Sequence, residues 1–172
     1  TPLGVLLFSL RMIYTHCMIH IHFVCTGNTY RSRLAEMYLR SKELPNIKVS
    51  SSGIEASKNL SGPISWYTAR LAKHHKSTKH LSHSWTQTTN ELLSKADLVV
   101  FMAPIHHEQA EQEFAFHGVH KTLNIPDLLD LGIHPTTNTL DEDLRRMKLS
   151  EDTFGKIQRE VDVIIKSLAT TA

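Results

Sequence analysis

A cysteine and an arginine stand six positions apart in residues 25–32, which read Cys-Thr-Gly-Asn-Thr-Tyr-Arg-Ser. Cys25 directly follows an apolar run, and a Gly-Asn turn comes next, so we expect the cysteine at the carboxyl end of a buried strand. Successive backbone N–H groups in such a turn can form an anion-binding cup, and a helix that follows adds its positive end. The positive electrostatic potential of these N–H groups and of the helix end also favours the ionised form of a thiol. These residues therefore predict a nucleophilic thiolate beside a site for a tetrahedral oxyanion.

We expect the side chain of Arg31 to reach back over that anion-binding cup. A planar guanidinium can hold two oxygens of a phosphate-like anion at once, which the point charge of a lysine cannot do. Gly27 allows close approach of the backbone, and Asn28 tolerates the left-handed conformation that such a loop often requires. The Gly-Lys-Ser/Thr ending of a nucleotide-binding P-loop is missing. At this point one alternative stays open, in which Cys25 is a buried structural residue and Arg31 an exposed one.

The elements that must position this loop follow from the hydrophobic pattern. Apolar, β-prone runs alternate with segments of helical periodicity, which is typical of an α/β domain with a mostly parallel sheet. We expect three layers: a four-stranded, mostly parallel sheet flanked by helices, with the phosphate-binding loop after the first strand. Strands are predicted at residues 18–24, 47–49, 97–102 and 121–125. Helices are predicted at residues 32–44, from residue 63, at 88–95 with Thr88 as N-cap, at 104–116, and from Ser150 as N-cap.

Length, charge and cysteine content narrow the class of protein. The 172 residues fit one domain, and 41% hydrophobic residues suffice for a core without metal or disulfide support. The formal net charge is only +2, so nucleic acid is not an expected partner. The two cysteines, Cys17 and Cys25, exclude a disulfide framework of the secreted kind, and we expect a reducing, cytoplasmic setting.

Residues 1–17 open with a short apolar run at residues 3–10. This run is too short to span a bilayer, and it lacks the leading positive cluster of a signal peptide. We therefore interpret residues 1–17 as an N-terminal extension or remnant, followed by one domain at residues 18–172, and we expect no membrane partner.

Residues 24–36, VCTGNTYRSRLAE, resemble the signature of the low-molecular-weight protein tyrosine phosphatases, a family related to the bacterial protein-arginine phosphatases. The resemblance covers most of residues 18–168 and rests on five markers in the family's order. The markers are the Cys-x5-Arg-Ser loop at residues 25–32, Ser51-Ser52-Gly53, Ser82-His83, the apolar strand at residues 97–102, and Ile125-Pro126-Asp127.

This resemblance implies a two-step phosphoryl transfer that uses no metal and no cofactor. Cys25 would attack phosphorus to form a cysteinyl-phosphate, while Arg31 and the loop amides hold the equatorial oxygens. Asp127 would protonate the leaving group and then activate water. The implied substrate-binding residues are Thr26, Gly27, Asn28, Thr29, Tyr30 and Ser32, and the residues implied to support the loop are Ser51 and His83.

The chain departs from the family's pattern around the acid. The family usually continues Asp-Pro-aromatic, whereas Asp127 is followed by Leu128 and Leu129. An aromatic wall of the site is therefore not expected here, and Asp130 is a rival for the role of the acid.

Two further departures lie in the loop segment itself. Tyr30 stands where the family often has a second cysteine, so the reversible disulfide that can protect the nucleophile cannot form in that way. Arg33 replaces the usual proline, and we expect it to place another cation near the rim of the site.

Thr29 bears on the substrate. Family members directed at tyrosine commonly carry isoleucine at this position, and the protein-arginine phosphatases carry threonine. The resemblance therefore implies phosphotyrosine as the default substrate and phosphoarginine as the alternative. The expected partners are a phosphorylated protein or peptide, inorganic phosphate and oxyanion analogues.

Two other functions use a similar loop. Thioredoxin-coupled arsenate reductase needs two further cysteines downstream, and none follows Cys25. A catalytically silent oxyanion-binding module would not need Cys25, Arg31 and an aspartate together. Both functions are less favoured than a protein phosphatase.

The 12 histidines form no predicted metal site. His20 and His22 share one face of a strand, but no carboxylate or cysteine completes an obvious set of ligands. The pairs His74-His75 and His106-His107 are interpreted as parts of solvated helix ends and loops.

Overall fold

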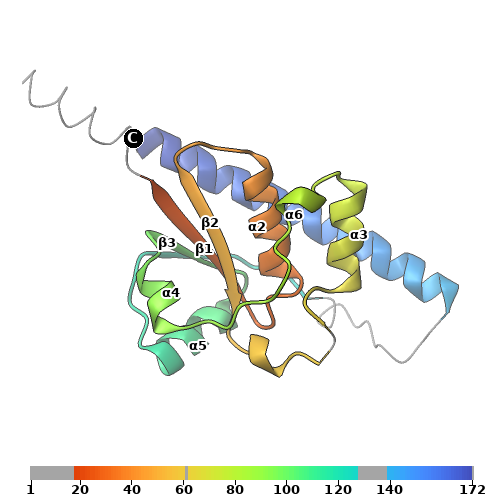
Figure 1. Ribbon diagram of the computed structural model, residues 1–172, viewed down its shortest axis with the longest axis horizontal. Coiled ribbons are helices and arrows are strands. Elements are labelled where there is room, and N and C mark those ends of the chain that lie inside the picture. Colours follow the sequence, from red (N-terminus) through yellow and green to blue (C-terminus); the bar gives the residue numbers. More distant parts are fainter. Residues whose placement is uncertain (1–17, 61, 128–138, 172) are drawn as a thin grey trace, which may run out of the picture.

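The computed structural model describes residues 18–60, 62–127 and 139–171 (Figure 1). The predictions about residues 1–17, and those about Leu128, Leu129 and Asp130, lie outside the described residues.

Four parallel strands form the sheet, in the order β2-β1-β3-β4. They are β1 (Ile19–Cys25), β2 (Ile47–Gly53), β3 (Leu98–Phe101) and β4 (His120–Thr122). The chain places β2 on one side of β1 and then β3 on the other. The crevice at the carboxyl ends of β1 and β3 is therefore a topological switch point, where open α/β sheets bind their ligands. The predicted four-stranded parallel sheet is confirmed.

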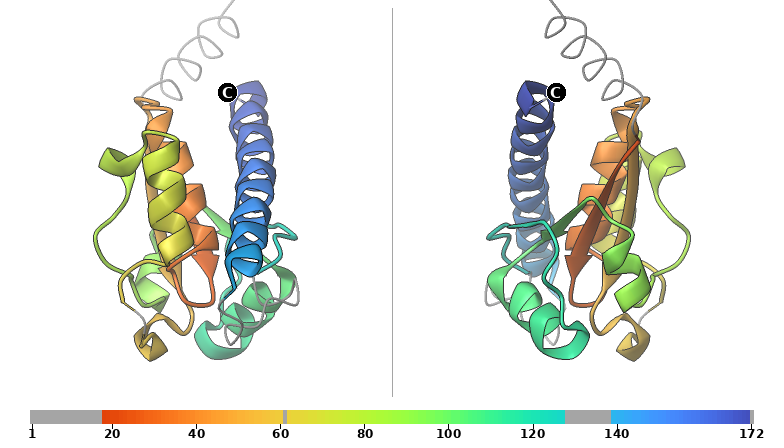
Figure 2. Two further views of the ribbon diagram at one scale, coloured as in Figure 1. Left: turned by 90° about the vertical axis from the view of Figure 1, so that its right-hand side faces the viewer. Right: turned by 90° about the vertical axis from the view of Figure 1, so that its left-hand side faces the viewer.

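Helices cover both faces of this sheet and produce three layers (Figures 1 and 2). One face carries α2 (Arg31–Ser41), α3 (Trp66–His74) and α6 (Leu140–Thr171). The other carries α4 (Asn90–Ser94) and α5 (Pro104–Phe114). The described residues also include the short 3-10 turns η1 (Ala56–Lys58) and η2 (Thr78–His80).

The core divides between these two faces because side chains of a strand alternate. Ile21, Phe23 and Cys25 of β1 point into the core shared with α2 and α6. Val24 points the other way and packs with Phe101. Since all three odd-numbered residues are fully or almost fully buried, β1 holds the cysteine at the end of a rigid central strand.

Two predicted N-caps were wrong. Helix α6 begins at Leu140, ten residues before Ser150, and the Ser150 hydroxyl donates a hydrogen bond of 2.8 Å to the carbonyl of Arg146 within the helix. A serine that bonds one turn back in this way can lie inside a helix. Helix α4 is capped by Thr89, whose hydroxyl accepts from the N–H of Leu92, while Thr88 is buried.

None of the helices in the described ranges is long and apolar enough to cross a membrane.

Candidate active site

Cys25 ends β1 with its sulfur among hydrogen-bond donors. The Ser32 hydroxyl lies 2.9 Å from the sulfur, and the backbone N–H of Asn28 donates to it over 3.2 Å. The residue is only 3% exposed. Because α2 begins at Arg31, its positive N-terminal end also lies beside this loop. These groups stabilise negative charge on the sulfur and on an anion bound next to it.

Asn28 holds the turn in its required shape. Its φ of 53° is in the left-handed region, which costs a non-glycine residue roughly 1–3 kcal/mol unless its surroundings fix it. Its side-chain amide donates to the hydroxyls of Ser32, at 2.9 Å, and Ser51, at 2.8 Å. Its side-chain oxygen accepts from the N–H of Thr86 at 2.8 Å. The buried Asn28 side chain therefore ties the loop to α2, to β2 and to the segment before α4.

Gly53 supports the same turn from below by having no side chain. A Cβ at this position would lie 2.6 Å from the backbone nitrogen of Asn28 and 2.6 Å from the carbonyl oxygen of Thr26. The residue that follows, Ile54, donates its N–H to the carbonyl of Cys25 at 3.0 Å. The sequence identified Gly53 only as part of a marker; this close backbone approach is the physical reason for it.

Arg33 does not lie near the rim of the site, so that expectation was wrong. Its side chain is 1% exposed and points into the molecule. The guanidinium pairs with Glu36 at 3.3 Å and donates to the carbonyls of Ser82 and Ser84. Burial lowers the pKa of Arg33, and the negative charge of Glu36 opposes this effect. The arginine is accommodated inside because a carboxylate and two carbonyls take up hydrogens of its two terminal nitrogens, although its buried Nε has no hydrogen-bond partner among the described residues.

Glu36 connects this buried arginine to the phosphate-binding loop. It accepts a hydrogen bond of 2.7 Å from the hydroxyl of Ser51, which in turn accepts from Asn28. Its other carboxylate oxygen pairs with Arg40 at 2.7 Å. Glu36 was not among the residues predicted from the sequence. Its signal was an acidic residue placed among the apolar side chains of a predicted helix.

His83 takes no part in the hydrogen bonds described for Asn28. Its side chain is exposed, while the carbonyls of Ser82 and Ser84 on either side turn inward to Arg33. Ser51 therefore accepts from the side-chain amide of Asn28, and Thr86 supplies the bond to the Asn28 side-chain oxygen.

Arg31 and Asp127 meet directly above the loop. Their side chains form an ion pair of 2.7 Å, and Arg31 also donates to the carbonyl of Ile125 at 3.1 Å. The Asp127 side chain is 32% exposed, whereas that of Arg31 is almost completely buried. The structure thus brings the predicted clamp and the predicted acid together at the carboxyl edge of the sheet.

His106, which the sequence analysis interpreted as part of a solvated helix end, is fully buried beside this pair. Its Nε2 lies 3.0 Å from the hydroxyl of Thr26 and 3.5 Å from a guanidinium nitrogen of Arg31. The available signal was its position in the first turn of α5, which follows the carboxyl end of β3 and therefore lies at the same edge of the sheet.

Thr29 and Tyr30 complete the loop. The carbonyl of Thr29 accepts from the N–H of Ser65 at 3.0 Å and from the hydroxyl of Thr68 at 2.8 Å, so the beginning of α3 supports it. The ring of Tyr30 is buried in the core, and this burial raises the pKa of its phenol. Tyr30 therefore contributes its backbone rather than its ring to the loop.

The two histidines of β1 bond to serine hydroxyls of β2. His20 and His22 lie 2.7 and 2.6 Å from the hydroxyl of Ser50, and His22 lies 2.7 Å from that of Ser52. Burial, with a smaller contribution from His20, lowers the pKa of His22 to about 3. These imidazoles are therefore explained as hydrogen-bonded interior groups beneath the loop.

Comparisons with known proteins agree with this geometry. A family model described as low molecular weight phosphotyrosine protein phosphatase matches residues 20–171. A protein-arginine-phosphatase of Bacillus subtilis is 37% identical over 97 residues, which are 55% of this chain and 62% of that protein. The low molecular weight protein-tyrosine-phosphatase PtpB of Staphylococcus aureus is 35% identical over 98 residues, 57% of this chain and 66% of that protein. The matched part thus spans less than two thirds of each of these relatives.

A solved structure gives a similar result for the fold. The solution structure of a low molecular weight protein tyrosine phosphatase from Bacillus subtilis superimposes with a TM-score of 0.61 and 25% sequence identity. This likeness covers 86% of the present chain and 98% of that protein.

Proposed function

The chain belongs to the low molecular weight phosphotyrosine protein phosphatase family, and we propose that it hydrolyses phosphotyrosine in proteins through a cysteinyl-phosphate intermediate. One observation carries this proposal: the Cys25 sulfur lies among donors at the start of α2, in a loop whose arginine contacts a candidate acid. A structural cysteine would not need that arrangement.

In the first step the Cys25 sulfur attacks phosphorus. The S–P bond forms as the bond between phosphorus and the phenolic oxygen breaks, and Asp127 gives its proton to that oxygen. Arg31 and the loop N–H groups hold the equatorial oxygens, on which negative charge is spread in the transition state. An incoming phosphoryl group competes with Asp127 for the guanidinium, so substrate binding would release the carboxylate from its ion pair, and the carboxylate would take up a proton from solvent and turn toward the leaving group.

In the second step water attacks the cysteinyl-phosphate. Asp127, now a carboxylate, accepts a proton from the water, the S–P bond breaks, and inorganic phosphate leaves. The Ser32 hydroxyl, 2.9 Å from the sulfur, can donate to the departing thiolate and so make it a better leaving group.

A protein-arginine phosphatase is the second candidate. Thr29 stands at the position where the resemblance distinguishes the two groups, and the Bacillus subtilis relative named above is a protein-arginine-phosphatase. The same nucleophile and clamp would serve, with Asp127 protonating a guanidinium nitrogen instead of an oxygen.

We further propose a cytoplasmic setting, with phosphorylated proteins or peptides as partners. The proposed nucleophile works only as a free thiolate, and a reducing compartment preserves it in that form.

Steady-state hydrolysis of p-nitrophenyl phosphate, followed by parallel kinetics on phosphotyrosyl and phosphoarginyl peptides, tests both candidates. Wild type should turn over at least one peptide class, and Cys25→Ser should turn over neither. Turnover of neither class by wild type, with phosphate still bound, would favour the silent oxyanion-binding module instead.

A further inference from the structure

A cluster of three side chains with metal-binding atoms lies away from the phosphate-binding loop, where the end of α3 meets α6. His74 is the last residue of α3, His75 follows it, and Glu151 lies on α6. One ligand atom from each lies within 4.8 Å of the other two, and Nε2 of His75 is 3.1 Å from a carboxylate oxygen of Glu151. This cluster could not be predicted from local sequence, because Glu151 is 76 positions from His75.

We propose that His74, His75 and Glu151 bind a divalent transition-metal ion of the zinc type, which clamps α3 to α6. Two imidazole nitrogens and one carboxylate oxygen form a ligand set that zinc commonly uses. Zinc holds such atoms at about 2.0–2.2 Å, which places tetrahedral ligands roughly 3.3–3.6 Å apart. The three side chains are exposed, so small rotations about their side-chain bonds can bring the atoms to that spacing.

The surroundings orient two of the three ligands in advance. The His75 ring lies against the ring of Phe154, with their centroids 4.9 Å apart, and the His74 and His75 rings are 5.0 Å apart. Phe154 is itself a buried residue of α6. Both histidines also lie at the C-terminal end of α3, where the helix dipole favours positive charge.

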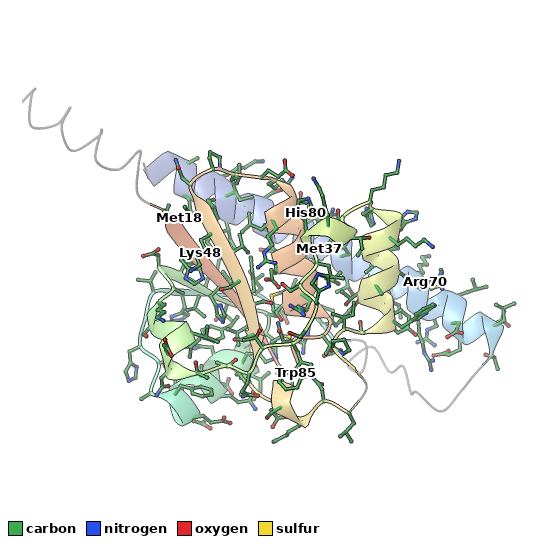
Figure 3. All side chains as sticks on the ribbon, in the orientation of Figure 1. Met18, Met37, Lys48, Arg70, His80 and Trp85 are labelled. Atoms are coloured by element: carbon green, nitrogen blue, oxygen red, sulfur yellow. The ribbon has the colours of Figure 1, made fainter. Side chains whose placement is uncertain are left out.

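A groove between the two helices adjoins two of the three ligands and leaves room for a fourth ligand. A cavity of about 300 Å³ is lined by His74 and Glu151 and by the cationic side chains Arg70 and Lys148. Arg70 is labelled on α3 in Figure 3. These cations oppose binding of a metal ion, so we expect weaker affinity than at a buried zinc site. They also favour an anion or hydroxide as the fourth ligand.

This site and the phosphate-binding loop lie at opposite ends of α3. The first turn of α3 supports the carbonyl of Thr29 through Ser65 and Thr68, whereas His74 ends the helix. Ligand variants should therefore alter metal binding without removing any group that touches the phosphoryl group.

Zinc alone, added to the metal-free chain, tests the proposal. Isothermal titration should show binding by wild type, and Tm should rise with zinc. His75→Gln and Glu151→Gln should each weaken binding at least tenfold, since even loss of a group that merely orients a ligand costs about 10- to 100-fold. The Tm of each variant without zinc shows whether it has folded.

Two controls separate this site from other zinc-binding groups. His107 also lies beside a carboxylate, that of Glu111, at 3.7 Å, and its ring stacks on that of His120, so His107→Gln removes a half-buried histidine that has a histidine and a glutamate as neighbours and should leave zinc binding unchanged. Because thiolates bind zinc, the titration is repeated in Cys25→Ser, where the zinc-dependent rise in Tm should persist. Equal affinity in wild type, His75→Gln and Glu151→Gln would overturn the proposal, as would loss of the rise in Cys25→Ser.

Discussion

The phosphate-binding loop and the segment that carries Asp127 lie at the same edge of the sheet, but the fold holds them differently. The side chain of Asn28 has three described hydrogen-bond partners on three parts of the chain, and Gly53 packs directly against the turn. Asp127 belongs to no helix or strand, and its side chain is about a third exposed. It forms an ion pair with Arg31, the residue that has to bind the phosphoryl group of the substrate.

This difference fits the two tasks in the proposed reaction. Stabilising a phosphoryl group requires donors that are in place before the charge develops, because reorganising them costs part of the benefit. The acid has to face the leaving group in one step and water in the next, so it must be able to change partners. Arg31 belongs to both regions. When a phosphoryl group binds in the loop and takes over the guanidinium, Asp127 is released from its ion pair.

Cys25→Ser should give the largest effect, because it removes the chemistry while leaving the loop intact. We expect turnover of p-nitrophenyl phosphate to fall by more than about 10⁴-fold, as for other enzymes that lose their nucleophile. Phosphate or vanadate binding, measured by calorimetry, should remain. Full residual activity would show that the sulfur is not the nucleophile.

Asp127→Asn tests the role of the less firmly held region, the segment that carries the proposed acid. Loss of a general acid typically costs about 10²–10⁴-fold, and the loss should be greater for alkyl or plain phenyl phosphates than for p-nitrophenyl phosphate. The rates for a series of leaving groups give this dependence directly. Asp130→Asn is the matched variant, and a steeper dependence in that variant alone would assign the acid to Asp130.

Arg33→Met tests the buried ion pair with Glu36, which is connected through Ser51 and Asn28 to the phosphate-binding loop. It removes the buried partner of Glu36, which keeps its ion pair of 2.7 Å with Arg40, so we expect a loss of about 3 kcal/mol in the free energy of unfolding, the low end of the range for breaking a buried ion pair. Arg40→Met removes the more exposed partner of the same carboxylate and should cost roughly 1 kcal/mol or less. Urea unfolding of both variants makes the comparison. Equal losses would mean that Glu36 does not depend on the buried arginine.

Acidification probes the strands beneath the loop. The pKa of His22 is lowered to about 3 in the folded protein. Between about pH 6.5 and about pH 3 the unfolded chain therefore binds more protons at this residue than the folded chain does. Its contribution to stability is therefore complete above about pH 6.5 and is lost as the pH falls toward 3. Urea unfolding of wild type across this range should show a steeper loss than that of His22→Gln. Parallel curves for the two proteins would contradict the assignment.

The loop was predictable because its chemistry is local in sequence. A strand end, a Gly-Asn turn and a helix start fall within residues 25–32. The hydrophobic periodicity on either side, the residue types of the turn and the charged arginine therefore all indicate the same structure. The fold was predictable for a similar reason, since the alternation of apolar runs and helical segments is also read locally.

The supporting residues were not predictable in that way. Arg33 reaches carbonyls 49 and 51 positions further along the chain, and His106 lies 75 positions from the arginine it approaches. Whether a charged side chain points to a rim or into the interior depends on such distant partners. Local periodicity carries no information about them, which is why Arg33 was expected near the rim of the site.

Thr29→Ile should produce the smallest change, and it bears on the substrate rather than on the chemistry. Ser65, the N-cap of α3, and Thr68 bond to the carbonyl of Thr29, so exchange of the side chain leaves these hydrogen bonds and the position of Cys25 in place. A difference of one or two methyl-sized contacts in a pocket is worth about 1–3 kcal/mol, or roughly 10- to 200-fold in discrimination. The ratio of kcat/KM on phosphoarginyl and phosphotyrosyl peptides should therefore shift toward phosphotyrosine by roughly tenfold or more. Thr26→Val alters another loop threonine and serves as the comparison: if it moves the ratio as far as Thr29→Ile does, specificity does not depend on position 29.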